Sequence, residues 1–400
     1  MNNAIKLAAD IGGTFTDIVL EAGRQRWSGK VLTTTQAPEL GVIEGIGLVL
    51  EQSGMNPADI GVFIHGTTLA TNALIERKGA KTAFVTTRGF RDILEQGYEK
   101  RFDHYDLMID RSVPLVPRTL RFTVEERLSA DGDVLQPLDE SALQELARQL
   151  RGENVKAVAI GFLHAYAHDG HERRVREILS AALPKDVTIC ISSEVAPEIR
   201  EFERFSTVVA NAYVRPLMAG YLHRLRDQLR DMKMDCPLFL MMSGGGLTTL
   251  ETAARFPIRL VESGPAGGAI LASEIAAECA LPEVVSFDMG GTTAKICLLT
   301  NGEPERARKF EIARAYRDMK GSGIPVRIPV IEMVEIGAGG GSIARVDKLN
   351  RITVGPDSAG STPGPVCYGR GGTEPAVTDA NLALGKIDPA YFAGGKIRLD

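Results

Sequence analysis

The sequence has few cysteines, and none of them lie close together. The five are odd in number and widely spaced, with no C-x-x-C pair among Cys190, Cys236, Cys279, Cys297 and Cys367. This spacing excludes a zinc ribbon and a disulfide framework. Free thiols are typical of a reducing compartment, so we expect a cytoplasmic protein. Cys297 lies within the apolar run of residues 294–299, where a strand is expected, and we expect it to be buried and unreactive.

Long hydrophobic runs and an excess of charge of one sign are missing as well. No stretch reaches the roughly 18 apolar residues of a membrane span, and Gly12 and Gly13 interrupt the N-terminal residues before the apolar core of a signal peptide can form. The 46 Lys and Arg residues face 51 Asp and Glu, which gives a net charge of −5. We therefore expect a soluble protein without a nucleic-acid or membrane partner.

What the sequence does contain is an alternation of apolar, β-branched runs with segments of helical periodicity, which is typical of an α/β fold. We expect strands over residues 5–10, 15–20, 61–64, 81–87, 155–162, 187–192, 237–242, 284–288 and 294–299. Helices are expected over 39–52, 69–78, 139–150, 169–183 and 267–279, and a helical stretch over 203–232 contains Pro216, which should kink or divide it.

The chain of 400 residues has room for about two to three domains. A boundary near Pro184 is plausible, so we expect one lobe over residues 1–183 and a second lobe over residues 184–400. From Gly337 onward glycine, proline and serine become frequent and periodicity fades, which predicts ordered loop.

One five-residue motif occurs twice. Residues 10–14 read DIGGT and residues 288–292 read DMGGT, and each copy joins two apolar strands. This context predicts a β-hairpin rather than the strand-to-helix turn of a P-loop. Glycines let backbone N–H groups approach an anion closely, and a threonine hydroxyl adds a donor. Two such hairpins facing each other would grip the phosphates of a nucleotide, although tight turns capped by aspartate are the alternative.

The two loops resemble the phosphate motifs of the actin-like ATPase superfamily, and the whole chain resembles the hydantoinase A/5-oxoprolinase family. The matching segments are ADIGGTFTD (9–17), HGTTLATNA (65–73), TTRGFRD (86–92), ESGPAGG (262–268), EIGAGGGS (335–342), GPVCY (364–368) and TDAN (378–381). The resemblance implies an α/β fold with actin-like, ribonuclease H-like lobes, in which helices flank mixed sheets. It also implies an ATP-dependent enzyme that opens a cyclic amide such as a hydantoin, an N-methylhydantoin, 5-oxoproline or a lactam.

In the family's chemistry ATP phosphorylates the amide oxygen, and water attacks the activated group. The resemblance assigns Asp10 and Asp288 to Mg²⁺ (or Mn²⁺) and to the γ-phosphate. The residues expected to cradle the phosphates are Gly12, Gly13, Thr14, Gly290, Gly291, Thr292 and Thr293. Lys295 would neutralise developing charge or point to solvent. Gly339 and Gly340 lie in a loop that would close over nucleotide or substrate, or form a structural turn.

The family implies a heteromeric enzyme with a B-type partner subunit. Related ATPase subunits of ketone carboxylases give an alternative reaction, and a small-molecule kinase is a weaker one. Family members typically continue past the length of this chain, with a glycine-rich segment that helps hold adenosine. A non-catalytic partner module is therefore another possibility, and residues 242–246 could serve the base instead.

The histidines allow two further site hypotheses. His65 ends a strand before a small polar turn that opens a helix, where it could act as acid or base. The alternative is a strand-end histidine hydrogen-bonded to the backbone. His164, His168 and His171 have the spacing of metal ligands on a helix, but Asp169-Gly170 breaks the helix there. A loop followed by a helix capped by Asp169 is the favoured interpretation.

Overall fold

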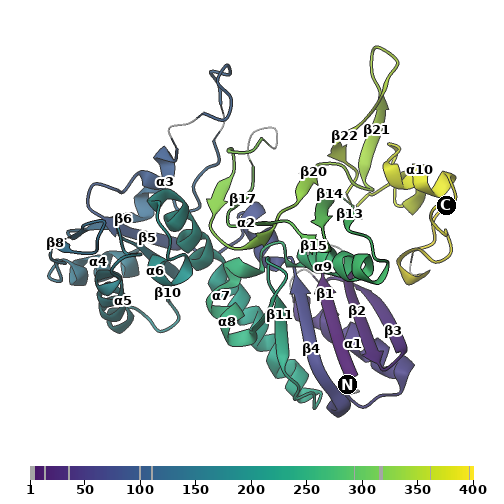
Figure 1. Ribbon diagram of the computed structural model, residues 1–400, viewed down its shortest axis with the longest axis horizontal. Coiled ribbons are helices and arrows are strands. Elements are labelled where there is room, and N and C mark those ends of the chain that lie inside the picture. Colours follow the sequence, from purple (N-terminus) through teal and green to yellow (C-terminus); the bar gives the residue numbers. More distant parts are fainter. Residues whose placement is uncertain are drawn as a thin grey trace.

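The computed structural model describes residues 5–12, 15–34, 37–98, 101–109, 111–291, 293–314, 319–360, 362–395 and 397–400. Three sheets organise the chain (Figure 1). The first is six-stranded in the order β12–β11–β4–β1–β2–β3, with β1 (Ile5–Ile11), β2 (Phe15–Ala22), β3 (Gln25–Leu32), β4 (Ile60–Thr67), β11 (Leu238–Met241) and β12 (Leu247–Thr249). β4 runs parallel to β1 and to β11, and the remaining pairs are antiparallel.

The second sheet has four parallel strands in the order β10–β9–β5–β6. These are β5 (Thr82–Thr87), β6 (Arg121–Val124), β9 (Ala157–Gly161) and β10 (Thr188–Ile191). Every residue of β5 and β9 is buried, as expected for parallel strands covered on both faces. A small antiparallel pair of β7 (Arg127–Leu128) and β8 (Val134–Gln136) adjoins this part of the chain.

The third sheet is small and antiparallel. It joins β13 (Glu283–Met289), β14 (Ala294–Thr300), β15 (Glu303–Pro304) and β20 (Val334–Ile336). Two-stranded pairs complete the set, namely β16 (Arg306–Ala307) with β19 (Val330–Ile331), β17 (Phe310–Ile312) with β18 (Ile324–Val326), and β21 (Ser342–Val346) with β22 (Ile352–Ser358).

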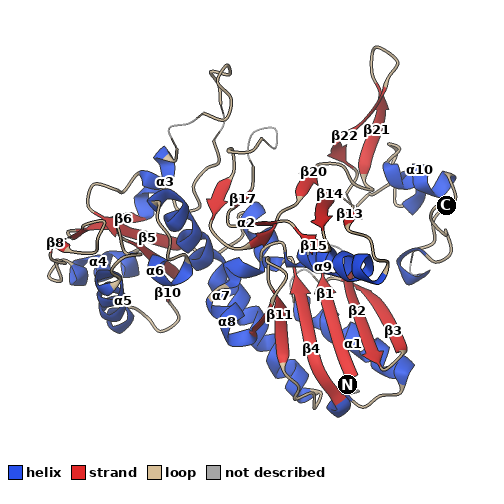
Figure 2. Ribbon diagram, viewed as in Figure 1, coloured by secondary structure: helices blue, strands red, loops and turns tan. Residues whose placement is uncertain are grey.

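Helices connect and cover these sheets (Figure 2). They are α1 (Pro38–Ser53), α2 (Leu69–Ile75), α3 (Ile93–Gln96), α4 (Leu143–Gly152), α5 (Gly170–Ala182), α6 (Ser192–Val195), α7 (Glu201–Asp231), α8 (Leu250–Arg255), α9 (Ser263–Glu278) and α10 (Val377–Ala383). α1 packs on β1, β2 and β3, whereas α9 contacts β4 and β11 as well as β13, β14 and β15. α9 therefore joins the first sheet to the third.

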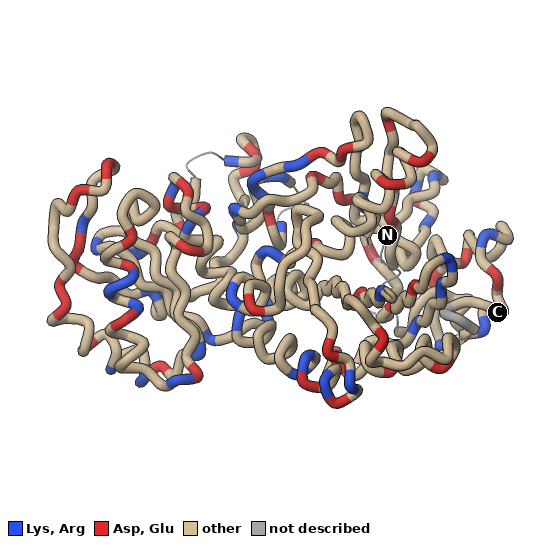
Figure 3. The backbone as a smooth tube through the Cα atoms, turned by 60° about the horizontal axis from the view of Figure 1, so that its bottom comes forward, with Lys and Arg blue, Asp and Glu red and all other residues tan. Residues whose placement is uncertain are grey.

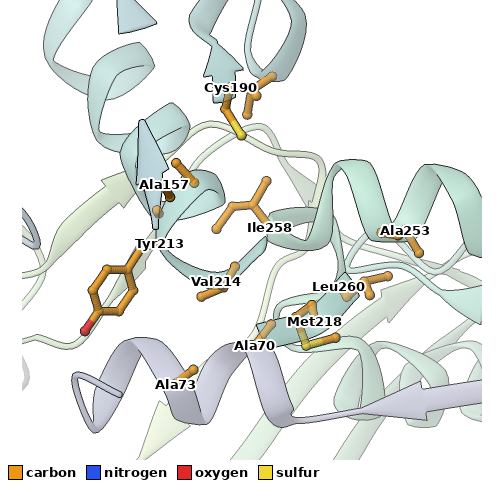
Figure 4. Close-up of a cluster of buried hydrophobic side chains, with 14 of the residues drawn as sticks. Ala70, Ala73, Ala157, Cys190, Tyr213, Val214, Met218, Ala253, Ile258 and Leu260 are labelled. Carbon is orange, nitrogen blue, oxygen red and sulfur yellow. The ribbon is translucent and has the colours of Figure 1, made fainter. Parts of the chain in front are cut away.

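Of the two outcomes expected at Pro216, a kink or a division of the helix, the longest helix, α7, excludes the division. The helix is not divided there but runs without interruption over 31 residues. Side chains on both sides of the proline are buried, among them Tyr213, Val214, Met218 and Tyr221. Figure 4 shows three of these beside Ala70 and Ala73 of α2. This packing outweighs the roughly 3 kcal/mol that an internal proline costs a helix.

Most expected elements are present, and the structure adds others. β3, β6 and the β21–β22 hairpin are strands that the sequence pattern does not predict. The segment from Gly337 onward is therefore not only loop, since it holds this hairpin and α10. β11 and β12 join the sheet of β1 to β4 although they follow residue 183. The division into lobes at 183/184 remains a prediction.

All five cysteines are free thiols. Cys190, Cys297 and Cys367 are buried, Cys236 is half-buried and Cys279 is exposed. The expectation of a buried Cys297 is confirmed, and burial raises the pKa of its thiol. Acidic and basic residues are interspersed along the whole chain (Figure 3). None of the described helices combines the length and the apolar character that a membrane crossing needs.

Candidate nucleotide site

The candidate site lies where the parallel strands of the first sheet end. β1, β4 and β11 run in one direction, and Asp10 near the end of β1 is in register with Gly66 of β4. The first turn of α9 closes against this edge, because the Ser263 hydroxyl donates to the Thr67 carbonyl (3.1 Å) and accepts from the Thr67 N–H (3.3 Å). Ligands of open α/β sheets bind outside the carboxyl ends of parallel strands.

The Asp10 carboxylate is lodged between two glycines. A Cβ atom at Gly66 would lie 2.6 Å from Asp10 Oδ1, and a Cβ atom at Gly264 would lie 3.3 Å from Asp10 Oδ2. Any side chain at Gly66 would therefore displace the carboxylate. Neither glycine is predicted from the sequence to contact the site, although both lie in segments that resemble the family, and this resemblance is the sequence signal that points to them.

Asp10 and Asp288 face the same space. Removal from water raises the pKa of the Asp10 carboxyl above its ordinary value, the negative charges of Asp17 and Asp288 raise it further, and Lys30 opposes them. Lys30 itself pairs with Asp17, with Nζ 2.6 Å from Oδ1. Asp10 and Asp288 are far apart in sequence, so their mutual repulsion indicates that the fold places the two copies of the motif near each other, between the first and third sheets.

Both copies form antiparallel hairpins, as predicted. The turns close with the same backbone bond: the Gly12 N–H donates to the Phe15 carbonyl (2.9 Å), and the Gly290 N–H donates to the Thr293 carbonyl (3.0 Å). Three of the residues expected to cradle phosphate, Gly13, Thr14 and Thr292, lie outside the described residues. Gly291 is exposed and Thr293 is half-buried.

Different groups brace the two hairpins. The Thr33 hydroxyl donates to the Gly12 carbonyl (3.0 Å) and contacts the Thr16 hydroxyl (3.0 Å). At the second hairpin the N–H groups of Gly340 and Gly341 donate to the carbonyls of Gly290 and Gly291, at 2.9 and 2.7 Å.

The expected closing loop therefore lies directly against the second hairpin. The Gly340 N–H donates to the Gly290 carbonyl, and the Gly339 N–H donates to the Ser342 hydroxyl (2.8 Å). In this arrangement Gly339 and Gly340 support the loop of Gly290, and their N–H groups are not directed to a phosphate. Their role in cofactor binding stays a prediction.

Lys295 does not point to solvent. Its ammonium pairs with Glu262, the residue before α9, and lies 3.8 Å from Glu335 Oε1. Burial lowers the pKa of Lys295, and Glu335 opposes this effect. The lysine thus ties β14 to the start of α9, beside the space between the aspartates.

His65 is fully buried in the first sheet. Its Nδ1 lies 3.0 Å from the Ala9 carbonyl and its Nε2 lies 2.6 Å from the Tyr221 hydroxyl. With Nδ1–H donating to Ala9, Nε2 accepts from Tyr221. Burial lowers the pKa of His65 to about 4. Both nitrogens are occupied by protein groups, which fits the alternative of a strand-end histidine hydrogen-bonded to the backbone.

The other histidine hypothesis, a metal site at His164, His168 and His171, receives no support. His171 Nδ1 bonds Glu126 at 2.9 Å, whereas His164 Nδ1 lies 3.9 Å from Glu201. Within the described ranges no group of three or more His, Cys, Asp or Glu side chains is placed to hold a metal ion. Asp169 precedes α5 as expected, but its carboxylate bonds Arg173 (2.6 Å) rather than capping the helix.

Residues 242–246 are the segment that could contact the base of the nucleotide. They form the turn after β11, at the same edge of the sheet as Gly66. The Ser243 hydroxyl is buried and donates to the Arg259 carbonyl (2.7 Å).

An apolar hollow lies elsewhere, between the loop after α3, the start of α7 and the β17–β18 pair, with an empty volume of about 760 Å³ including the solvent at its mouth. Ser206 of α7 lines it, whereas Tyr221 of the same helix reaches His65. The helical rise separates these two residues by about 22 Å, so the hollow is distinct from the space at Asp10.

Two family models together match most of this chain. Residues 6–183 match the hydantoinase/oxoprolinase N-terminal region, and residues 204–400 match hydantoinase/oxoprolinase. The caprolactamase subunit alpha of Pseudomonas jessenii is 37% identical over 99% of this chain and 56% of its own length. The acetophenone carboxylase gamma subunit of Aromatoleum aromaticum is 32% identical over 98% of this chain and 54% of its own length.

Two solved structures have the same fold. The ATP-dependent caprolactamase from Pseudomonas jessenii superposes with a TM-score of 0.83 at 36% identity, over 99% of this chain and 57% of that one. Nucleotide-free acetone carboxylase gives a TM-score of 0.80 at 27% identity, over 100% and 57%. This chain therefore spans a little over half the length of these relatives. It has the actin-like ATPase fold and belongs to the hydantoinase/oxoprolinase family.

Proposed function

We propose that this chain binds ATP between its two hairpin loops and uses it to activate a cyclic amide for hydrolysis, as the A-type subunit of a heteromeric enzyme. The observation that carries this proposal is the approach of Asp10 and Asp288, each at the end of a matching hairpin, across one space. Gly12, Gly290, Gly291 and Thr293, with the undescribed Gly13, Thr14 and Thr292, would line the phosphates.

The donor set fits a magnesium ion. The negative charge of Asp288 contributes to the raised pKa of Asp10, and a divalent cation bound between the two carboxylates would relieve this repulsion. Mg²⁺ is typically held by one or two carboxylates and the substrate phosphates and keeps several waters. It therefore needs no third protein ligand, and Asp10 and Asp288 would suffice.

The proposed chemistry is phosphoryl transfer to the amide oxygen. The amide oxygen forms a bond to the γ-phosphorus as the bond to the β-bridging oxygen breaks, which leaves ADP and an activated imidate that water can attack. Catalysis of this kind depends on positioning and charge stabilisation. This chain's own residues would position the phosphates and the cation. His65 is left out of the reaction because its ring nitrogens are occupied.

Calorimetric titration with ATP and Mg²⁺ tests the nucleotide site. We expect Asp10→Asn and Asp288→Asn each to weaken binding about 100-fold, because each removes one charge that holds the cation. Glu21→Gln is the matched control, since it removes a carboxylate from the opposite end of the first hairpin, where Glu21 pairs with Lys6 and Arg26. Wild-type affinity in both aspartate variants would refute the assignment.

The resemblance to carboxylase subunits favours a second candidate function, the ATPase subunit of a ketone carboxylase. The two reactions can be distinguished by mixing this chain with a B-type subunit and measuring which substrate stimulates ATP hydrolysis. Stimulation by caprolactam or 5-oxoproline supports the amide reaction, and stimulation by acetone plus bicarbonate supports carboxylation. Binding of the B-type subunit without ATP hydrolysis would identify a non-catalytic partner module.

A further inference from the structure

The apolar hollow beside α7 is built from four segments that are distant in sequence. Its floor is one face of α7, because Phe202, Ser206 and Val209 follow one another at spacings of four and three residues. Its walls come from α3 and the loop after it, from the segment 111–115 and from the β17–β18 pair. Hollows lined by rings and aliphatic side chains, with a few polar groups among them, are typical of small-molecule sites.

One polar group at the floor of the hollow has no partner. Ser206 is only 4% exposed, and its hydroxyl makes no hydrogen bond to any residue that the structure describes. The neighbouring Thr207 hydroxyl, by contrast, donates to the Glu203 carbonyl (2.6 Å) and accepts from the Arg327 N–H (2.8 Å). A buried hydroxyl without a partner costs free energy. A ligand with a polar group at its inner end would supply the partner that Ser206 lacks.

The mouth of the hollow carries positive charge without a matching carboxylate. The exposed Arg111 lines it, and its Nη1 donates to the Gln96 carbonyl (3.0 Å). Arg77 donates from Nη2 to the hydroxyl of Ser112, which also lines the hollow (3.3 Å). Neither guanidinium forms an ion pair with a carboxylate of the described residues. Both are therefore available to a negatively charged ligand.

The two acidic residues among the described lining residues are already engaged. Glu95 Oε2 lies 2.8 Å from Nη1 of Arg121. Glu311 accepts from the Gly321 N–H (2.7 Å), and its carboxylate lies 3.5 Å from Nε of Arg314. The hollow thus offers an anion two guanidinium groups, whereas it offers an ammonium group no free carboxylate among these residues.

We propose that the apolar hollow is a ligand site for a small aromatic carboxylate. The ring of the ligand would pack against Tyr98, Phe102 and Phe202, where Tyr98 already stands edge-on to Phe202 with ring centroids 4.9 Å apart. The carboxylate would bind Arg111, whose guanidinium can donate two parallel hydrogen bonds to it. A polar substituent at the far end of the ring would bond the Ser206 hydroxyl. The hollow is distinct from the space at Asp10, so this proposal does not rest on the proposed function.

Titration by ligand-observed NMR, without nucleotide, tests the site with three matched probes. 4-Hydroxybenzoate has both polar ends, benzoate lacks the hydroxyl and phenol lacks the carboxylate. We expect 4-hydroxybenzoate to bind about fivefold more tightly than benzoate, which is the effect of one neutral hydrogen bond. It should bind about tenfold more tightly than phenol, because the bond between a guanidinium and a carboxylate is charge-assisted.

Two variants assign the two ends of the ligand. Ser206→Ala should lower the affinity for 4-hydroxybenzoate about fivefold and leave that for benzoate unchanged. Arg111→Gln should lower the affinity for both carboxylates about tenfold and leave that for phenol unchanged. Pairing a change in the ligand with a change in the protein isolates each contact. Arg148→Gln, at an exposed position of α4, is the matched control and should bind all three probes as the wild type does.

Three results would overturn the proposal. The first is that none of the probes shows saturable binding to the wild-type chain. The second is that the three probes bind equally, or that both variants bind them as the wild type does. The third is loss of 4-hydroxybenzoate binding in Asp10→Asn, which would place the ligand at the candidate nucleotide site. No nucleotide is present in this titration, so its outcome is independent of the calorimetric test with ATP.

Discussion

The two hairpins share a motif and a turn but not their surroundings. The first hairpin is in the middle of a six-stranded sheet, with parallel β4 on one side and α1 on one face. The second belongs to a small antiparallel sheet, one face of which carries the exposed side chains of Val285, Phe287 and Met289. The motif therefore dictates the turn and the position of the aspartate, whereas the burial of the strands depends on segments that are distant in sequence.

The two hairpins also differ in how much they contribute to the stability of the protein, although both contribute to the candidate site. The first hairpin contributes to the large hydrophobic core, while the second packs in a separate cluster with α9. Both hairpins nevertheless supply one aspartate each to the same space. Changes at equivalent positions should therefore affect folding unequally and nucleotide binding alike.

The largest expected effect is at Leu7, which is compared with Val285 because each residue lies three positions before the aspartate of its motif. Leu7→Ala should lower the free energy of unfolding by about 3 kcal/mol, because Leu7 is fully buried and its loss leaves a cavity. Val285→Ala should lower it by less than about 0.5 kcal/mol, because Val285 is exposed. Urea unfolding of both variants measures this. Equal losses would show that Val285 is covered in solution and would remove the contrast between the hairpins.

The next effect concerns the space around Asp10. Gly66→Ala should weaken ATP binding about 100-fold with little change in stability, because the new methyl group displaces the carboxylate and small displacements in a site are costly. Gly264→Ala should have a weaker effect in the same direction, since its Cβ would lie farther from Asp10.

Gly268→Ala is the control for this series. It lies on α9 in the same motif, and a Cβ atom there meets nothing within 4 Å. Calorimetry and urea unfolding of all three variants distinguish a local effect from unfolding. Unchanged affinity in Gly66→Ala would mean that the position of Asp10 is not important for binding.

The smallest effect is the pH dependence of the first sheet. His65 has a pKa of about 4 in the folded protein against 6.5 for an ordinary histidine, so the unfolded chain binds the proton first. Stability should fall as the pH drops from about 6.5 towards 4, by about 2 kcal/mol at pH 5. Urea unfolding at pH 7.5 and pH 5 measures the loss.

The variant His65→Gln should lose less stability between these pH values, although it starts from a lower one. His223→Gln, at an exposed position of α7, should keep the wild-type pH dependence. A His65→Gln variant with the full wild-type pH dependence would assign the effect to other groups.

Much of the fold follows from local patterns. The apolar alternation predicted β1, β2, β13 and β14, and the paired glycines predicted both hairpin turns. β3 was missed because its sequence, QRWSGKVL, has little apolar alternation, and its place is set by pairing with β2. Pro216 does not divide α7, and the packing on both sides of it that holds the helix together is not visible in the local sequence.

The aspartates and glycine turns of the site could be predicted from the sequence. The residues that hold them in place were harder to predict. The contact of Gly66 and Gly264 with Asp10 joins three distant segments, so spacing alone does not reveal it. The same holds for the braces from Thr33 and from Gly340. The sequence is compatible with either a catalytic or a structural role for His65. Only its burial against Tyr221 in the structure favours the structural role.

Cys279 gives the protein a natural labelling position. It is the one exposed thiol of the five, and it directly follows α9, the helix that joins the first and third sheets. A maleimide dye should therefore react there first, a few residues before β13 begins. Fluorescence from this single position would follow nucleotide binding beside Asp10 without any engineered cysteine.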